Sequence, residues 1–168
     1  MVDLAKTRND PLQQLWDVVE NIHAGMLGVE DSHQHMQPMA PFLEKETNSI
    51  WFYTKADTDL VQAVRTGDRA HFCVVGKDHD YHACLAGPID EELSREKVDK
   101  FWSPLVAAWY DESGKDDPLL TMLRLRVEDV SIWASTGSSV RFGWEIAKAN
   151  LTNSEPDVGV HTQLTLPH

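Results

Sequence analysis

Two threonines and a lysine, Thr54, Lys55 and Thr58, stand close together where a predicted strand passes into a predicted helix. Hydroxyl and ammonium groups donate hydrogen bonds, and the start of a helix adds backbone N–H groups and the positive end of its dipole. Such a corner favours an anion, and a phosphate group would fit it. An ordinary capped turn has the same residue types at the same spacing, so the pattern leaves both interpretations open.

A second candidate region is the segment of residues 36–45, which contains Pro38 and Pro41. Proline has no N–H group and cannot donate a hydrogen bond to a neighbouring strand. The segment is therefore predicted to be an edge strand, or a place where something other than a strand lies alongside.

The two cysteines, Cys73 and Cys84, flank a candidate turn at residues 76–80. A hairpin centred between Asp78 and His79 would place the two thiols directly opposite each other, which makes a cross-strand disulfide geometrically feasible. The alternative, which we favour, is two reduced small hydrophobic residues on a buried face, because nothing in the sequence indicates an oxidising compartment.

Histidine pairs offer a rival chemistry. His33 and His35 would lie on one face of a strand, and His79 and His82 are three residues apart, so either pair could contribute to a metal site. Neither pair has the sequence context of a known zinc site, and His33 and His35 fall in a predicted loop. We therefore expect solvated histidines and no metal.

The elements that must position these residues alternate between short strands and a few helices. A helix is expected from Pro11, and the helix after Thr58 ends at Gly67. Further helices are expected at residues 94–102, from residue 104, and from Ser138 or Ser139. Strands are expected at residues 26–29, 36–45, 49–55, 69–76, 81–89 and 121–135, the last with a bulge at Asp129, and residues 158–166 could add one more. Hairpin-length connections favour an α+β fold with an antiparallel barrel core over a parallel sheet.

Length and composition narrow the function classes. The 168 residues, 42% of them hydrophobic and without repeats or linkers, are expected to form one domain over residues 1–168. A net charge of −12 disfavours nucleic acid and anionic membranes as partners. No apolar run suits a membrane span or a signal peptide, so a soluble, cytoplasmic protein is expected.

Two stretches carry a resemblance to a known family. Gln37-Pro38-Met39, and Trp51-Phe52-Tyr53-Thr54-Lys55 running into a short helix, resemble the general stress proteins of the pyridoxamine 5′-phosphate oxidase-like, FMN-binding split-barrel group. The likeness extends over residues 11–151. It implies an α+β fold with an antiparallel six-stranded split β-barrel and flanking helices. It also implies a homodimer with a flavin at the interface, FMN with FAD as the alternative.

The resemblance implies the site residues as well. The flavin ring would lie against residues 36–39, and the turn with Thr54, Lys55 and Thr58 would hold the phosphate. The aromatic segment 133–144 would approach from the partner subunit. The expected cofactor-binding residues are Met36, Gln37, Pro38, Met39, Phe52, Tyr53, Thr54, Lys55, Thr58 and Trp133. No side chain stands out as an obligatory acid or base, so no catalytic residue is assigned.

The sequence departs from the family pattern at two positions. Gln37 stands where many relatives have arginine, and Leu60 stands where a lysine is usual, so two positive contacts to the flavin are missing. Lys55, Arg65 or Arg141 are the candidates to replace them. No arginine follows Arg141, although true pyridoxamine phosphate oxidases grip their substrate with one near the C-terminus, so that activity is not expected.

Three functions follow as hypotheses. The first is a flavin-dependent oxidoreductase in which the cofactor transfers hydride or electrons and the protein supplies position and access. The second is a stress protein that binds flavin without catalysis, and the third is a dimeric interaction module without flavin.

Overall fold

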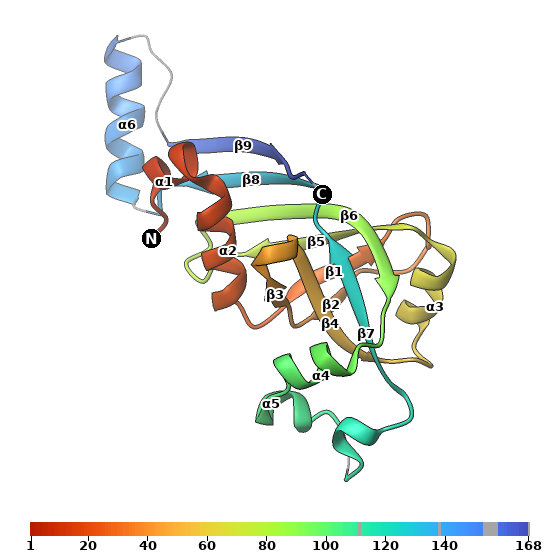
Figure 1. The fold of residues 1–168 in the computed structure, drawn as a ribbon. Coiled ribbons are helices and arrows are strands. Elements are labelled where there is room, and N and C mark those ends of the chain that lie inside the picture. Colours follow the sequence, from red (N-terminus) through yellow and green to blue (C-terminus); the bar gives the residue numbers. More distant parts are fainter. Residues whose placement is uncertain (111, 138, 153–157, 168) are drawn as a thin grey trace.

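The computed structural model describes residues 1–110, 112–137, 139–152 and 158–167, which form a mixed α+β fold around a curled antiparallel sheet (Figure 1). The strands are β1 (Gly25–Val29), β2 (Gln37–Met39), β3 (Phe42–Glu44), β4 (Ser49–Lys55), β5 (Arg69–Val75), β6 (Tyr81–Glu91), β7 (Leu120–Arg126), β8 (Asp129–Ser135) and β9 (Gly159–Thr165). The helices are α1 (Leu4–Asn9), α2 (Pro11–Asn21), α3 (Asp59–Thr66), α4 (Arg95–Phe101), α5 (Pro104–Ala107) and α6 (Ser139–Thr152), with short 3₁₀ turns at Lys45–Thr47 and Gly114–Asp116.

The sheet runs in the order β2-β1-β5-β6-β7-β4-β3, and β8 and β9 branch from β6. The long strand β6 makes this branching possible, because its first part pairs with β8 and its last part pairs with β7. Gly87 lies between these two parts, and a Cβ added there would stand 1.8 Å from the carbonyl oxygen of Arg126. Only glycine admits so close an approach of two backbones, and this approach lets the sheet curl into a half-barrel.

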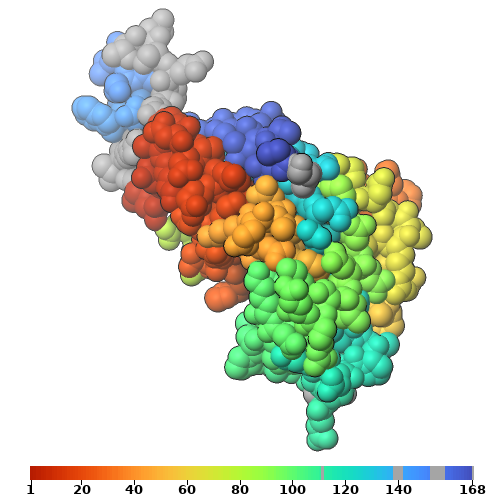
Figure 2. Space-filling model, viewed as in Figure 1, coloured from red at the N-terminus to blue at the C-terminus, as the bar shows by residue number. Residues whose placement is uncertain are grey.

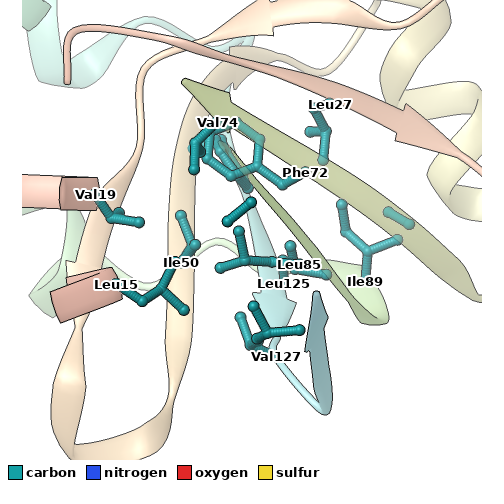
Figure 3. Packing of buried hydrophobic residues seen from close by; sticks show 14 of the residues in the cluster. Leu15, Val19, Leu27, Ile50, Phe72, Val74, Leu85, Ile89, Leu125 and Val127 are labelled. Carbon is teal, nitrogen blue, oxygen red and sulfur yellow. The ribbon is translucent and has the colours of Figure 1, made fainter. Parts of the chain in front are cut away.

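The main core fills the inside of this half-barrel. Alternate residues of the strands point inward, as a period of two requires, and meet the apolar stripe of α2, which contributes Leu15 and Val19 (Figure 3). Leu27, Phe72 and Leu85 are completely buried among them.

A second, smaller core lies on the opposite face of β4, under α4 and α5. Trp51 and Met122 of the sheet pack there against Val98 of α4 and Val106 of α5. Strand β4 is therefore covered on both faces, and its odd-numbered and even-numbered side chains enter different layers.

The predicted α+β class with an antiparallel split barrel is confirmed, but the predicted number of six strands is wrong. Residues 36–45 form two strands, because the chain leaves β1 at residues 40–41 and crosses to pair with β4. Residues 121–135 also form two strands, separated at residues 127–128, where backbone bonds to Asn48 and Ala86 turn the chain between the two branches. The sequence marked both corners, with Pro41 in the first and a change of apolar phase at Glu128-Asp129 in the second, but it was interpreted as an interrupted strand and a bulge.

Other expectations agree with the structure. The hairpin of β5 and β6 has the predicted register, with Cys73 opposite Cys84, and β9 forms the last strand. The final helix is present as α6, and Ser138, one of its two proposed caps, lies outside the described residues. No helix within the described ranges is long and apolar enough to cross a membrane.

Candidate functional site

The threonine corner, defined as Thr54 and Thr58, forms where β4 ends and α3 begins. Thr58 is the N-cap of α3: its Oγ1 accepts a hydrogen bond from the Val61 amide at 3.4 Å and donates one to the Lys55 carbonyl at 2.9 Å. The Oγ1 atoms of Thr54 and Thr58 lie 3.4 Å apart. The structure thus brings both predicted hydroxyls together at the start of a helix, where backbone amides have no partner inside the helix.

Lys55 does not join the two threonines. Successive residues of a strand point to opposite faces, so Lys55 projects toward the second core while Thr54 follows the main core. Its Nζ atom lies 3.2 Å from Oδ2 of Asp117, whose side chain is 7% exposed, and 5.6 Å from the centre of the Tyr110 ring. The ammonium group expected at the anion is therefore held by a nearly buried carboxylate.

Arg65, another candidate cation, is also paired with a carboxylate. Both nitrogens of the Arg65 side chain that face Glu91 bond to its carboxylate, at 2.6 and 3.0 Å. The side chain of Arg141 lies outside the described part of the structure. Leu60, at the position where relatives have lysine, is 3% exposed and belongs to the main core, so packing requires an apolar residue there.

Strand β2 lies at one edge of the sheet, as its proline predicted. Gln37 and Met39 are half-buried and Pro38 is exposed, opposite Met26 of β1. Met36 is 37% exposed and its side chain lies over Gly28, where an added Cβ would approach Met36 Cγ to 2.8 Å. Residues 36–39 therefore present an accessible surface that combines apolar side chains with the amide of Gln37.

One residue that the sequence did not single out joins the two halves of the site. Gln34 donates a hydrogen bond from Nε2 to the carbonyl oxygen of Asp59, in the first turn of α3, at 3.0 Å. This bond holds the loop that leads into β2 against the beginning of the helix. Residues 36–39 and the threonine corner consequently lie in one region of the surface. In the sequence, His33 and His35 drew attention to this loop, but Gln34 between them makes the contact.

The predicted aromatic residues occupy three different environments. Phe52 is completely buried and packs edge to face on Phe72, with ring centres 5.0 Å apart, so its side chain offers no surface to a ligand in this chain. Tyr53 donates a hydrogen bond from its hydroxyl to the Val98 carbonyl at 2.7 Å, and burial raises the pKa of its phenol.

Trp133 is 47% exposed and stacks on His161 at a ring distance of 5.1 Å. It lies on β8, four strand spacings from β2 by way of β1, β5 and β6. At roughly 4.8 Å per spacing, about 19 Å of sheet separates Trp133 from Gln37. One chain therefore does not bring Trp133 to the surface of residues 36–39.

The Thr54 hydroxyl and the amides at the start of α3 suit the oxygens of a phosphate, and the Thr58 hydroxyl would join them by turning its hydrogen from the Lys55 carbonyl to the anion. The positive charge fits less well, since Asp117 holds Lys55. A positive charge for the phosphate would therefore come from Lys55 after it exchanges Asp117 for the anion, or from a cation of another chain.

Comparison with known proteins identifies the family. The family model described as pyridoxamine 5′-phosphate oxidase like matches residues 10–157. The chain belongs to this family. The sequence resemblance is thereby confirmed, and the structures of relatives agree with it.

General stress protein 26 of Bacillus subtilis (strain 168) is 28% identical over 130 residues, which cover 74% of this chain and 89% of the relative. A crystal structure from Jannaschia sp. CCS1, described as a general stress protein 26, is 34% identical with a TM-score of 0.76, and the match covers 94% of this chain and 99% of that one. A structure from Xanthomonas citri, described as a general stress FMN/FAD binding protein, is 34% identical with a TM-score of 0.68, and the match covers 75% of this chain and 89% of that one.

Proposed function

We propose that this protein binds a flavin, FMN with FAD as the alternative, between the two subunits of a homodimer. The observation that carries the proposal is the pairing of the Thr54 and Thr58 hydroxyls at the start of α3, in the same surface region as residues 36–39. The relative from Xanthomonas citri, described as an FMN/FAD binding protein, supports it.

Different residues would contact the ring and the phosphate of the flavin. Met36, Pro38 and Met39 would support the flat ring, and Gln37 would donate and accept hydrogen bonds at its polar edge. The threonine corner would hold the phosphate. A bound flavin supplies hydride or electron transfer, while these residues orient the ring and control access to it.

A second copy of the chain is the partner that we propose for the exposed aromatic residues. Helix α6 stands out from the body of the molecule (Figure 1; Figure 2) and exposes Phe142 (49%), Trp144 (68%) and Ile146 (36%). Phe142 and Ile146 are one turn apart on the same face of the helix, and exposed apolar side chains of this kind mark an interaction site. Because Trp133 lies about 19 Å along the sheet from Gln37, an aromatic wall for the ring would have to come from the partner subunit.

Titration of the purified protein with FMN tests the proposal. Flavin fluorescence should be quenched and the thermal midpoint should rise, because a ligand that binds only the folded state stabilises it. The double variant T54V/T58V should weaken FMN binding by about tenfold or more, as expected for the loss of two phosphate hydrogen bonds. Thr66→Val is the matched control, since Thr66 lies at the other end of α3 and is exposed. Protein that neither binds FMN nor gains thermal stability contradicts flavin binding.

The variant Asp117→Asn tests the role of Lys55 separately. Removing the carboxylate frees the ammonium group, so FMN affinity should rise several-fold if Lys55 turns to the phosphate. Unchanged affinity in Asp117→Asn, together with lost affinity in T54V/T58V, would show that the hydroxyls and helix amides hold the phosphate without this lysine.

A dimeric module without flavin is the second candidate function. The pairing of Lys55 with Asp117 and of Arg65 with Glu91 favours it, because both remove positive charge from the phosphate position. The same titration decides between the two functions, and analytical ultracentrifugation of the protein without flavin tests the dimer by itself.

A further inference from the structure

The two cysteines face each other on the outer side of the hairpin of β5 and β6. Both are free thiols and only half-buried, which corrects the expectation of a buried face. The Gly76 amide donates to the Tyr81 carbonyl at 2.8 Å, so Gly76 and Tyr81 form a hydrogen-bonded pair. Bonded and non-bonded pairs alternate along antiparallel strands. Counting three pairs from Gly76 and Tyr81 makes Cys73 and Cys84 a non-bonded pair.

The non-bonded register brings the two thiols into bonding range. Opposite Cα atoms in such pairs lie about 4.5 Å apart, with their side chains closer than in bonded pairs. Disulfides span Cα distances of roughly 4.4–6.8 Å. A bond between the two sulfurs therefore needs no movement of the strands.

An imidazole and a carboxylate stand beside the thiols. His71 Nδ1 lies 3.4 Å from Cys84 Sγ, and His71 Nε2 lies 2.8 Å from Oε1 of Glu30. A carboxylate only accepts hydrogen bonds, so Nε2 carries a hydrogen toward Glu30, and in the charged ring Nδ1 carries one as well and donates it to Cys84 Sγ. A charged imidazole held by a carboxylate beside two thiols favours a thiolate there, and it leaves the Cys84 S–H to donate to Cys73.

The two thiols differ in acidity because they share a proton. A hydrogen bond from Cys84 lowers the pKa of Cys73, and the charge of His71 adds to the effect. The same hydrogen bond raises the pKa of Cys84. The pair thus favours one thiolate beside one thiol, which is the state that an attacking and a resolving cysteine need.

We propose that Cys73 and Cys84 form an oxidation site that reduces a hydroperoxide and becomes a cross-strand disulfide. The Cys73 thiolate attacks one oxygen of the peroxide, the O–O bond breaks, and the other oxygen leaves as water or an alcohol after taking a proton. The Cys84 sulfur then attacks the Cys73 sulfenic acid, the S–O bond breaks, and the hydroxyl group leaves as water with the Cys84 proton. Two thiols lose two electrons, and the peroxide gains them.

The reaction at this site does not use the proposed flavin. The two cysteines lie on β5 and β6, between β2 and β8, and the proposed dimer would cover this region of the sheet. A small neutral oxidant such as hydrogen peroxide suits this position. The charged groups around the thiols are Glu30 after β1, Arg69 and His71 on β5, and Asp129 on β8.

The direct test adds one equivalent of hydrogen peroxide to the reduced protein without flavin and counts free thiols after unfolding. Both thiols should disappear together, and reduction should restore them. The product should run at monomer size on a non-reducing denaturing gel, and peptide mass spectrometry should join Cys73 to Cys84. In Cys84→Ser the reaction should stop at a sulfenic acid on Cys73, trapped by dimedone. Thiols that stay free, or a disulfide that joins two chains, would overturn the proposal.

The variant His71→Gln tests the positioning residue. The pH profile of thiol alkylation should shift to higher pH, and oxidation by peroxide should slow by about tenfold, because a thiol pKa about one unit higher leaves about a tenth of the thiolate. His82→Gln is the matched control, because His82 is exposed on the same face of β6 and lies opposite Trp133 rather than a cysteine. Equal rates in the native protein, in His71→Gln and in protein unfolded by urea would show ordinary surface thiols. Because no flavin is present, failure of FMN binding leaves these results unaffected.

Discussion

Two clusters of this molecule are each built around a glutamate, Glu44 under the second core and Glu30 on the outer face of the sheet. The Glu44 side chain is 5% exposed and accepts hydrogen bonds from Lys97 at 2.5 Å and Lys100 at 3.1 Å. Thr47 Oγ1 and Trp51 Nε1 also donate to it. Every direction around this carboxylate is occupied, and the bonds tie α4 to the sheet.

The Glu30 side chain is 40% exposed and has looser surroundings, with His71 Nε2 at 2.8 Å and Arg69 Nε at 3.8 Å. Water competes for such a group, so its ion pairs add little to the stability of the fold. The comparison teaches that burial decides whether a carboxylate cluster is structural or free to take part in chemistry.

The largest effect should come from breaking the buried cluster. Glu44→Gln leaves Lys97, which is 20% exposed, beside a neutral amide, and should lower the free energy of unfolding by about 3 kcal/mol. Urea denaturation measures the change. Glu46→Gln is the control, because Glu46 is exposed on the adjacent turn and its replacement should cost less than about 0.5 kcal/mol. Similar losses in both variants would contradict a structural role for the Glu44 cluster.

Acid should weaken the same cluster gradually. Burial alone raises the pKa of Glu44, but hydrogen bonds from Lys97, Thr47 and Lys100 outweigh it and lower the pKa to about 2. The folded protein therefore binds this proton less readily than the unfolded chain, so acid favours unfolding. The contribution is complete above the ordinary pKa of about 4.3 and is lost as the pH falls toward 2.

This loss amounts to about 3 kcal/mol if the unfolded chain titrates normally. The stability difference between the natural protein and Glu44→Gln should accordingly shrink between pH 5 and pH 2, as followed by denaturation at each pH. A difference that does not change with pH would assign the stabilisation to packing rather than to the charge.

The smallest effect on stability should come from the exposed cluster. Glu30→Gln should change the free energy of unfolding by less than about 0.5 kcal/mol, because its partners are solvated. Thiol alkylation near neutral pH should nevertheless slow in this variant, since the amide orients His71 less firmly than the carboxylate does. A large loss of stability with unchanged thiol reactivity would reverse the contrast between the two clusters.

Local patterns predicted most of the elements and part of the site. Proline in residues 36–45 indicated an edge strand, and the threonines at the end of a β-branched run indicated a capped helix start. The division of this segment into β2 and β3 escaped the sequence because it depends on which strands pair: β2 pairs back with β1, and β3 pairs forward with β4.

Charge partners were the part that local patterns could not predict. In the sequence, Lys55 follows Thr54 and precedes Thr58 by three positions, so the three residues look like a single anion-binding group. Its actual partner, Asp117, is 62 residues further along the chain and enters the neighbourhood only because β7 pairs with β4.

The sequence by itself determined the family, the antiparallel α+β class, the hairpin register that sets Cys73 against Cys84, and the capping role of Thr58. These features depend on residue types a few positions apart, which alternation and capping control directly. Only the tertiary structure decided that Lys55 turns to Asp117 and that Glu30 and His71 lie beside the thiols. Such contacts join distant segments, and the curvature and pairing of the sheet bring those segments together.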